Sequence, residues 1–216
     1  MASRAQTIVS ALLERHGTSF TDELGLDLTK DTPSPLFRWL CAAILMSARI
    51  SSDNAVRAAG ALAEAGWATA EHMAESSWEN RVKVLNENGY ARYDESTARM
   101  LGDDVVILID RYGGDLRKLR EAAGRDPDQV RKLLKEFKGI GDVGADIFCR
   151  EAQAAWDELY PFADKKALGS AKKLGLPSDA DGLSKLVTPQ DFPRLLSALV
   201  TSDLAGDHDE IRAAAG

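Results

Sequence analysis

Three glycines in six residues, Gly139, Gly141 and Gly144, mark the stretch FKGIGDVGADIF at 137–148. Each glycine disfavours a helix by about 1 kcal/mol relative to alanine, and a tight turn needs only one or two of them. The segments on both sides have helical patterns, so the glycines fall in a turn and at the start of the second helix. A helix start with so little side-chain cover exposes its unpaired N–H groups, and a phosphate is a natural ligand for them.

Other residues of this stretch fit a helical hairpin. Gly139 can end the first helix in a left-handed conformation, Asp142 can cap the second, and Lys138 adds a positive charge beside the phosphate site. A plainer interpretation is a helix-turn-helix in which the glycines only allow close packing. Spacing alone leaves both interpretations open.

The rest of the chain has the pattern of helices that could position this hairpin. The segment PLFRWLCAAILMSARI at 35–50 is apolar on all sides and should run through the middle of the fold. Most other segments begin with Ser or Asp and end with Gly. The run VVILI at 105–109 could be a buried strand, but no partner strand is evident. The sequence predicts an all-α protein of about ten short helices.

Composition limits the classes of protein that fit. The 216 residues suit one domain or two small lobes sharing a cleft, and the net charge of −7 excludes a coat of basic residues but not a local basic patch. Cys41 and Cys149 lie in apolar helical patterns and form neither a metal quartet nor a disulfide framework, which indicates a reducing, cytoplasmic location. We find no signal peptide and no run that could cross a membrane.

Three segments, in the right order, resemble the helix-hairpin-helix DNA glycosylase superfamily that includes endonuclease III. KGIGDVGAD at 138–146 resembles its hairpin, whose pattern is L-P-G-V-G-x-x-x-A. FADKKALGSAKKLGL at 162–176 is similar to the stretch that carries the catalytic Asp of that family, and ILMSARISSDNAVRA at 44–58 is similar to a segment upstream of the hairpin. The resemblance covers residues 34–205.

The resemblance implies roles for particular residues. Asp164 falls on the catalytic Asp, which stabilises a positively charged, oxocarbenium-like sugar and can orient or deprotonate the attacking water. Arg49 falls on a Gln that fills the gap left in DNA when the target base is flipped out. The residues implied to contact DNA are Arg49, Lys138, Gly139, Ile140, Gly141, Val143, Gly144, Lys165 and Lys166.

Plainer interpretations exist for two of these assignments. Asp164 also fits the N-cap of a helix over KKALGSAKKL, a role compatible with catalysis. The lysines of that helix, Lys165, Lys166, Lys172 and Lys173, could form a solvated face instead of contacting phosphates.

The chain departs from the family pattern at several positions. Val143 stands where bifunctional members carry the Lys that attacks the sugar, and valine cannot form a Schiff base. No Cys follows Cys149, so the four-cysteine iron–sulfur loop is absent and we expect no cofactor. Lys165 and Lys166 replace the Thr-His that follows the Asp in the family.

The architecture implied by the resemblance has two helical lobes. Residues 31–158 would form a barrel lobe ending in the hairpin, and residues 1–30 with 159–216 a second lobe, with Asp164 at the cleft. The expected function is that of a monomeric, monofunctional DNA glycosylase of base excision repair in the cytoplasm, associated with the nucleoid. It would hydrolyse the N-glycosidic bond of a damaged or mispaired base in double-stranded DNA, with alkylated purines favoured. The alternatives are a non-catalytic helix-hairpin-helix DNA-binding protein and a helical protein-interaction domain.

Overall fold

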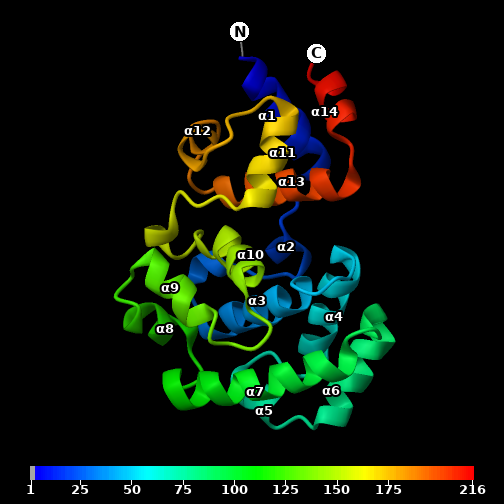
Figure 1. Cartoon of the computed structure of the whole chain (residues 1–216), viewed down its shortest axis with the longest axis vertical. Coiled ribbons are helices and arrows are strands. Elements are labelled where there is room, and N and C mark those ends of the chain that lie inside the picture. The colour runs from blue at the N-terminus through cyan, green and yellow to red at the C-terminus, as the bar shows by residue number, and fades with distance from the viewer. Residues whose placement is uncertain (1–2) are drawn as a thin grey trace. The chain divides into compact units, whose positions relative to one another are not determined.

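The computed structural model describes residues 3–216, a range that consists of helices and turns and contains no strand (Figure 1). The all-α prediction is therefore confirmed. The α-helices are α1 (Arg4–His16), α2 (Phe20–Glu23), α3 (Pro33–Met46), α4 (Ser52–Glu64), α5 (Ala70–Ala74), α6 (Trp78–Leu85), α7 (Asp94–Tyr112), α8 (Leu116–Ala122), α9 (Pro127–Leu134), α10 (Asp142–Ala152), α11 (Lys165–Leu174), α12 (Ala180–Ser184), α13 (Phe192–Ala205) and α14 (His208–Ala214). Short helical turns are η1 (Leu28–Lys30), η2 (Asn86–Tyr90) and η3 (Asp157–Leu159). No helix in the described range is long and apolar enough to span a membrane.

The VVILI run that could have been a strand lies inside α7. Val105 and Leu108 are buried, whereas Val106 is 53% exposed, which is the three-residue spacing of a helix face and not the alternation of a strand. The helix ends at Gly113, whose φ of 58° is left-handed.

The chain forms two compact units, residues 1–23 with 149–216 and residues 24–148. Their boundaries lie at 23/24 and 148/149, whereas the sequence-based lobes divide at 30/31 and 158/159. Hydrogen bonds explain why the boundaries of the two units lie at 23/24 and 148/149. Arg38 donates to the Leu24 carbonyl within the 24–148 unit, and Glu151 accepts from Phe20 and Thr21 within the other unit.

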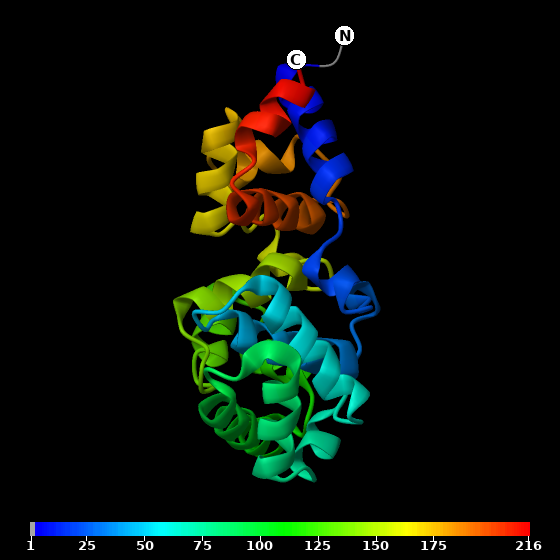
Figure 2. The same ribbon diagram turned by 90° about the vertical axis from the view of Figure 1, so that its right-hand side faces the viewer.

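The unit of residues 1–23 and 149–216 is a small helical bundle. Helix α13 packs against α1 and α11, and α14 packs against the same two helices, as both views show (Figure 2). Leu12 of α1 and Leu195, Leu196 and Leu199 of α13 are completely buried. Helices α1 and α13 therefore share one core.

The unit of residues 24–148 is built around α3. Trp39, Leu40 and Leu45 of this helix are at most 1% exposed, which confirms that the most apolar segment is central. Helix α3 packs against α4, α7 and α8, and the Trp39 indole donates a 3.0 Å hydrogen bond to the Phe148 carbonyl on α10. This bond ties the second helix of the glycine-rich hairpin to the core.

Candidate functional site

The glycine-rich stretch forms the expected helical hairpin between α9 and α10. Gly139 has a left-handed φ of 80°, and the Ile140 N–H donates to the Phe137 carbonyl in the turn. The backbone ladder of α10 begins when the Ala145 N–H donates to the Gly141 carbonyl at 3.0 Å, so the N–H groups of Val143 and Gly144 precede it. The start of α10 is therefore available to an external acceptor.

Asp142, expected to cap the second helix of the hairpin, lies in the first turn of α10, and its exposed carboxylate pairs with Lys135 at 3.0 Å. The pairing with a residue of the preceding turn turns the Asp142 carboxylate towards α9, which a sequence pattern could not indicate.

Two of the three glycines lie close against other side chains of the protein. A Cβ on Gly139 would lie 3.0 Å from Met100 Sδ and 3.1 Å from Ile44 Cγ2. A Cβ on Gly144 would lie 2.7 Å from Ser47 Oγ. The plainer interpretation of the hairpin, close packing, therefore holds for these two positions.

Gly141 differs from its two neighbours. Its φ is not left-handed, its backbone is exposed, and a Cβ placed there would meet no atom within 4 Å. Neither backbone conformation nor internal packing requires glycine at this position. The open space at Gly141 leaves room for a group from outside the protein, such as the phosphate expected from the sequence.

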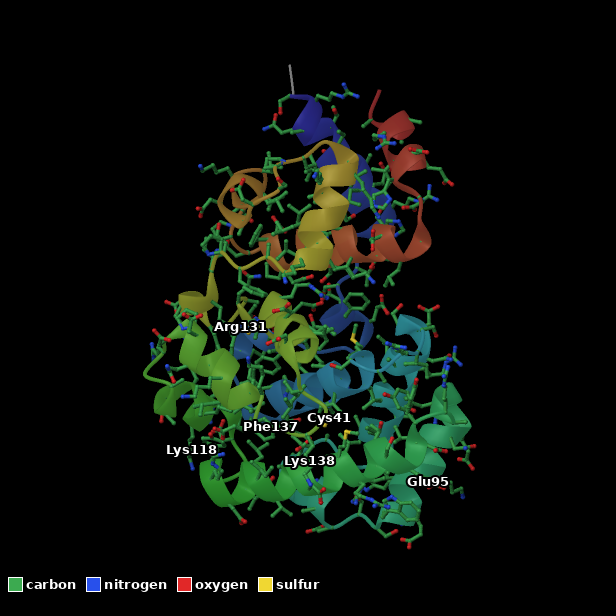
Figure 3. The ribbon with its side chains drawn as sticks, viewed as in Figure 1. Cys41, Glu95, Lys118, Arg131, Phe137 and Lys138 are labelled. Carbon is green, nitrogen blue, oxygen red and sulfur yellow. The ribbon has the colours of Figure 1, made fainter. Side chains whose placement is uncertain are left out.

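Two acidic residues of α7 hold Lys138, which is labelled in Figure 3. The Lys138 N–H donates to Asp104 Oδ1 at 2.6 Å, and its Nζ pairs with Asp103 Oδ2 at 2.6 Å. The exposed pair with Asp103 contributes at most about 1 kcal/mol, so a phosphate could displace it. Sequence reasoning missed both acids, although Asp104 lies at a buried register of α7 with Leu101 and Leu108.

The remaining predicted DNA contacts of this unit surround the hairpin start. Val143 is 63% exposed and Ile140 is buried. Arg49 is exposed in the turn between α3 and α4. The same turn begins at Ser47, whose hydroxyl lies against Gly144, so the structure brings the Arg49 turn next to the start of α10.

Asp164, in the other unit, is the N-cap of α11, as the plainer interpretation predicts. Its Oδ1 accepts the N–H groups of Lys166 at 2.9 Å and Ala167 at 3.2 Å. Its Oδ2 accepts from Arg150 Nε at 2.6 Å, and both side chains of this pair are 3% exposed. Lys165 and Lys166 are exposed in the first turn of α11.

Asp164 is held in its charged form. Burial by itself would raise the pKa of this carboxyl, but the charge and hydrogen bond of Arg150, with the two backbone N–H donors, hold the pKa below its usual value. The carboxylate is therefore ionised at neutral pH and carries its own buried counter-ion.

Three buried polar side chains at the end of α10 and directly after it support this arrangement, and sequence reasoning missed them. Arg150, Glu151 and Gln153 are at most 6% exposed. Glu151 accepts from Ser197 of α13 at 2.7 Å, and Gln153 bonds both the N–H and the carbonyl of Phe162. Gln153 thus fixes the segment that leads into Asp164. The available signal was REAQ at 150–153, three polar residues directly after the apolar IFC at 147–149.

No metal site is evident in the described residues, since no group of three or more His, Cys, Asp or Glu side chains could hold an ion there. Cys41 and Cys149 are buried thiols.

Comparison with known proteins shows which solved structures have a similar fold. No family model matches the sequence, and no curated protein matches it. Two solved structures are similar over 94% of this chain and 86% of theirs: a non-covalent endonuclease III–DNA complex (17% identity, TM-score 0.56) and a trapped endonuclease III–DNA covalent intermediate, an estranged-adenine complex (18% identity, TM-score 0.53). The fold expected from the hairpin and its companion segments is confirmed.

Proposed function

We propose that this protein is a monofunctional DNA glycosylase of base excision repair. It binds double-stranded DNA as a monomer, flips out a damaged or mispaired base and hydrolyses its N-glycosidic bond. The observation that carries the proposal is Asp164, a buried carboxylate held in its charged form by Arg150 at the position that corresponds to the catalytic Asp of the resembling family.

Asp164 acts mainly by stabilising charge. Breaking a base–sugar bond creates positive charge at the anomeric carbon, and a fixed carboxylate beside that carbon lowers the barrier. Because its pKa is lowered, Asp164 is a weaker base, so orienting the attacking water suits it better than removing a proton. Its side chain is 3% exposed in the free protein, so DNA binding has to uncover it.

The start of α10 binds a DNA phosphate. Gly141 leaves room for the phosphate, and Lys138 contributes its ammonium group once it leaves Asp103. Arg49, on the turn next to the hairpin, fills the space left by the flipped base. The solved structures that share the fold are both DNA complexes, which supports DNA as the partner.

The product is an intact abasic site. Val143 occupies the position of the amine nucleophile, and its exposed isopropyl group offers no electron pair to the sugar.

A panel of duplexes tests the proposal. Each duplex carries one lesion, either an alkylated purine, a deaminated or mispaired pyrimidine, or an oxidised base. We expect base release from at least one duplex, preferentially the alkylated purine, with strand cleavage only after alkali. Borohydride should trap no protein–DNA adduct. A trapped adduct would show that another lysine performs lyase chemistry.

A non-catalytic DNA-binding protein is the second candidate function. It is supported by the contacts of Asp164, since capping and the Arg150 pair together account for a structural role. This candidate predicts DNA binding that depends on Gly141, without base release from any duplex in the panel.

A further inference from the structure

Asp104 is a buried carboxylate with one unpaired oxygen. The residue is 3% exposed, and Oδ1 accepts the Lys138 N–H at 2.6 Å. Oδ2 is buried and has no hydrogen-bond partner among residues 3–216. A buried polar atom without a partner is costly, and such atoms in native structures call for an explanation.

Asp104 also lacks a cation of its own. The groups that face it are Asp103 on α7, Lys138 on the hairpin and the Cys41 thiol on α3, which is labelled in Figure 3. The Lys138 ammonium is engaged by Asp103. Burial raises the pKa of Asp104 to about 7, the Asp103 charge adds to this, and the N–H and charge of Lys138 oppose it. The carboxyl therefore changes charge near neutral pH.

The position of Asp104 links this titration to the hairpin. Its hydrogen-bond donor, Lys138, directly precedes Gly139 and lies three residues before Gly141, where a phosphate has room to approach. A phosphate on the start of α10 would add negative charge beside a carboxylate that is already poorly solvated. Like charges in a region of low dielectric favour protonation of the weaker acid.

We propose that Asp104 positions the hairpin through the Lys138 N–H and takes up a proton from solvent when the hairpin binds a DNA phosphate. The inference rests on the proposed DNA binding and deepens it. The protonated carboxyl keeps an oxygen that accepts the Lys138 N–H, so the hairpin stays anchored while the opposing charge is removed.

The affinity of the full chain for an undamaged duplex tests the proposal at constant ionic strength between pH 6 and 8.5. Affinity of the parent protein should fall by about tenfold or less per pH unit, the limit for one linked proton. Asp104→Asn keeps an acceptor for the Lys138 N–H and removes the charge. This variant should bind at pH 8 as tightly as the parent binds at pH 6, with a flat pH profile.

Asp103→Asn is the matched control. It removes the neighbouring, exposed carboxylate, which pairs with the ammonium group of the same residue, Lys138. This variant should raise affinity at every pH and keep a pH dependence of similar slope, shifted to lower pH because the Asp103 charge that helps raise the pKa of Asp104 is gone. A purely structural role of Asp104 would instead weaken binding of Asp104→Asn at every pH, with the slope of the parent.

Calorimetry of the parent protein gives a test that needs no variant. Binding measured at pH 7 in two buffers of different ionisation enthalpy should report net proton uptake. Absence of uptake, or an equal pH slope in Asp104→Asn, overturns the proposal. Missing base release with intact proton uptake overturns only the glycosylase assignment, whereas absence of DNA binding at every pH overturns both.

Discussion

The starts of α10 and α11 differ in what neutralises their positive charge. Each helix begins with unpaired N–H groups and the positive end of its dipole. In α11 the space is filled by Asp164, which accepts two N–H groups and a buried arginine. In α10 the corresponding space is bordered by Gly141 and is open. A helix start filled by its own anion cannot bind another, whereas an open start can.

Ordinary capping does not explain the surroundings of Asp164. Asp126 caps α9 through the Gln129 N–H at 2.9 Å, but it is exposed and needs no buried arginine. The other aspartates that cap a helix start through a side-chain hydrogen bond in the described range are likewise exposed or half-buried: Asp27, Asp115 and Asp179. Asp164 thus makes a buried ion pair that the capping of α11 does not require.

Removing Arg150 should have the largest effect of the changes considered. Arg150→Met leaves the Asp164 charge buried without a counter-ion, and we expect the free energy of unfolding at pH 7 to fall by about 3–5 kcal/mol. The pKa of Asp164 is lowered, so the stability from the pair is present above its unfolded pKa and is lost as pH falls through the folded pKa. The difference in the free energy of unfolding between the parent and Arg150→Met should therefore be smaller at acid pH. Urea unfolding at pH 7 and pH 3 measures it.

Arg111→Met provides the comparison, because Arg111 pairs with Glu136 at the surface. Its loss should cost less than about 1 kcal/mol. Equal losses in the two variants would mean that the buried pair has no special role.

Neutralising the carboxylate should separate catalysis from capping. Asp164→Asn keeps an acceptor for the N–H groups of α11 but removes the charge, so base release should fall by at least about 10²-fold. DNA affinity should hold or rise, since a negative charge near phosphates is lost. Single-turnover base release on the best duplex measures the effect, with Asp126→Asn as the control. A normal rate in Asp164→Asn would leave this residue as a cap only.

Blocking the open helix start should weaken DNA binding. Gly141→Arg adds positive charge, yet we expect affinity to fall about tenfold, because one charged hydrogen bond contributes about 1.5–3 kcal/mol. Since the φ of Gly141 is not left-handed and its surroundings are open, the thermal melt should not change. Affinity at several salt concentrations measures the effect.

Gly169→Arg on α11 matches this variant, because Gly169 is also exposed and its Cβ position is also open. This control should bind DNA at least as well as the parent. Improved binding by Gly141→Arg would instead show that the glycine serves no close approach.

The smallest expected effect concerns the anchor of the hairpin. Because the pKa of Asp104 is raised to about 7, its favourable contribution is present below its unfolded pKa and is lost as pH rises through about 7. Asp104→Asn should therefore gain stability relative to the parent between pH 6 and 8, by about 1–2 kcal/mol at pH 8. Denaturant unfolding at pH 6, 7 and 8 checks the sign of this stability change. A difference between Asp104→Asn and the parent that stays constant with pH would contradict the prediction.

Much of the fold follows from local signals in the sequence. The glycine at 113 ends α7, the left-handed Gly139 turns the hairpin, and Asp164 caps α11, each within a few residues of the position it controls. Such signals act through backbone conformation and hydrogen bonds inside one or two turns, so a single sequence reveals them. The apolar pattern of α3 likewise predicts its central place.

Tertiary structure alone decided which charges and glycines belong together. Arg150 pairs with Asp164 because packing buries both side chains together, and Asp104 accepts the Lys138 N–H because the fold brings α7 next to the hairpin. Three glycines that look alike in the sequence differ because a Cβ at Gly139 or Gly144 would lie 3.0 Å or less from another side chain, whereas one at Gly141 would meet no atom within 4 Å. The pKa of a carboxyl depends on its burial and on the charges around it, and distant segments of the chain supply both.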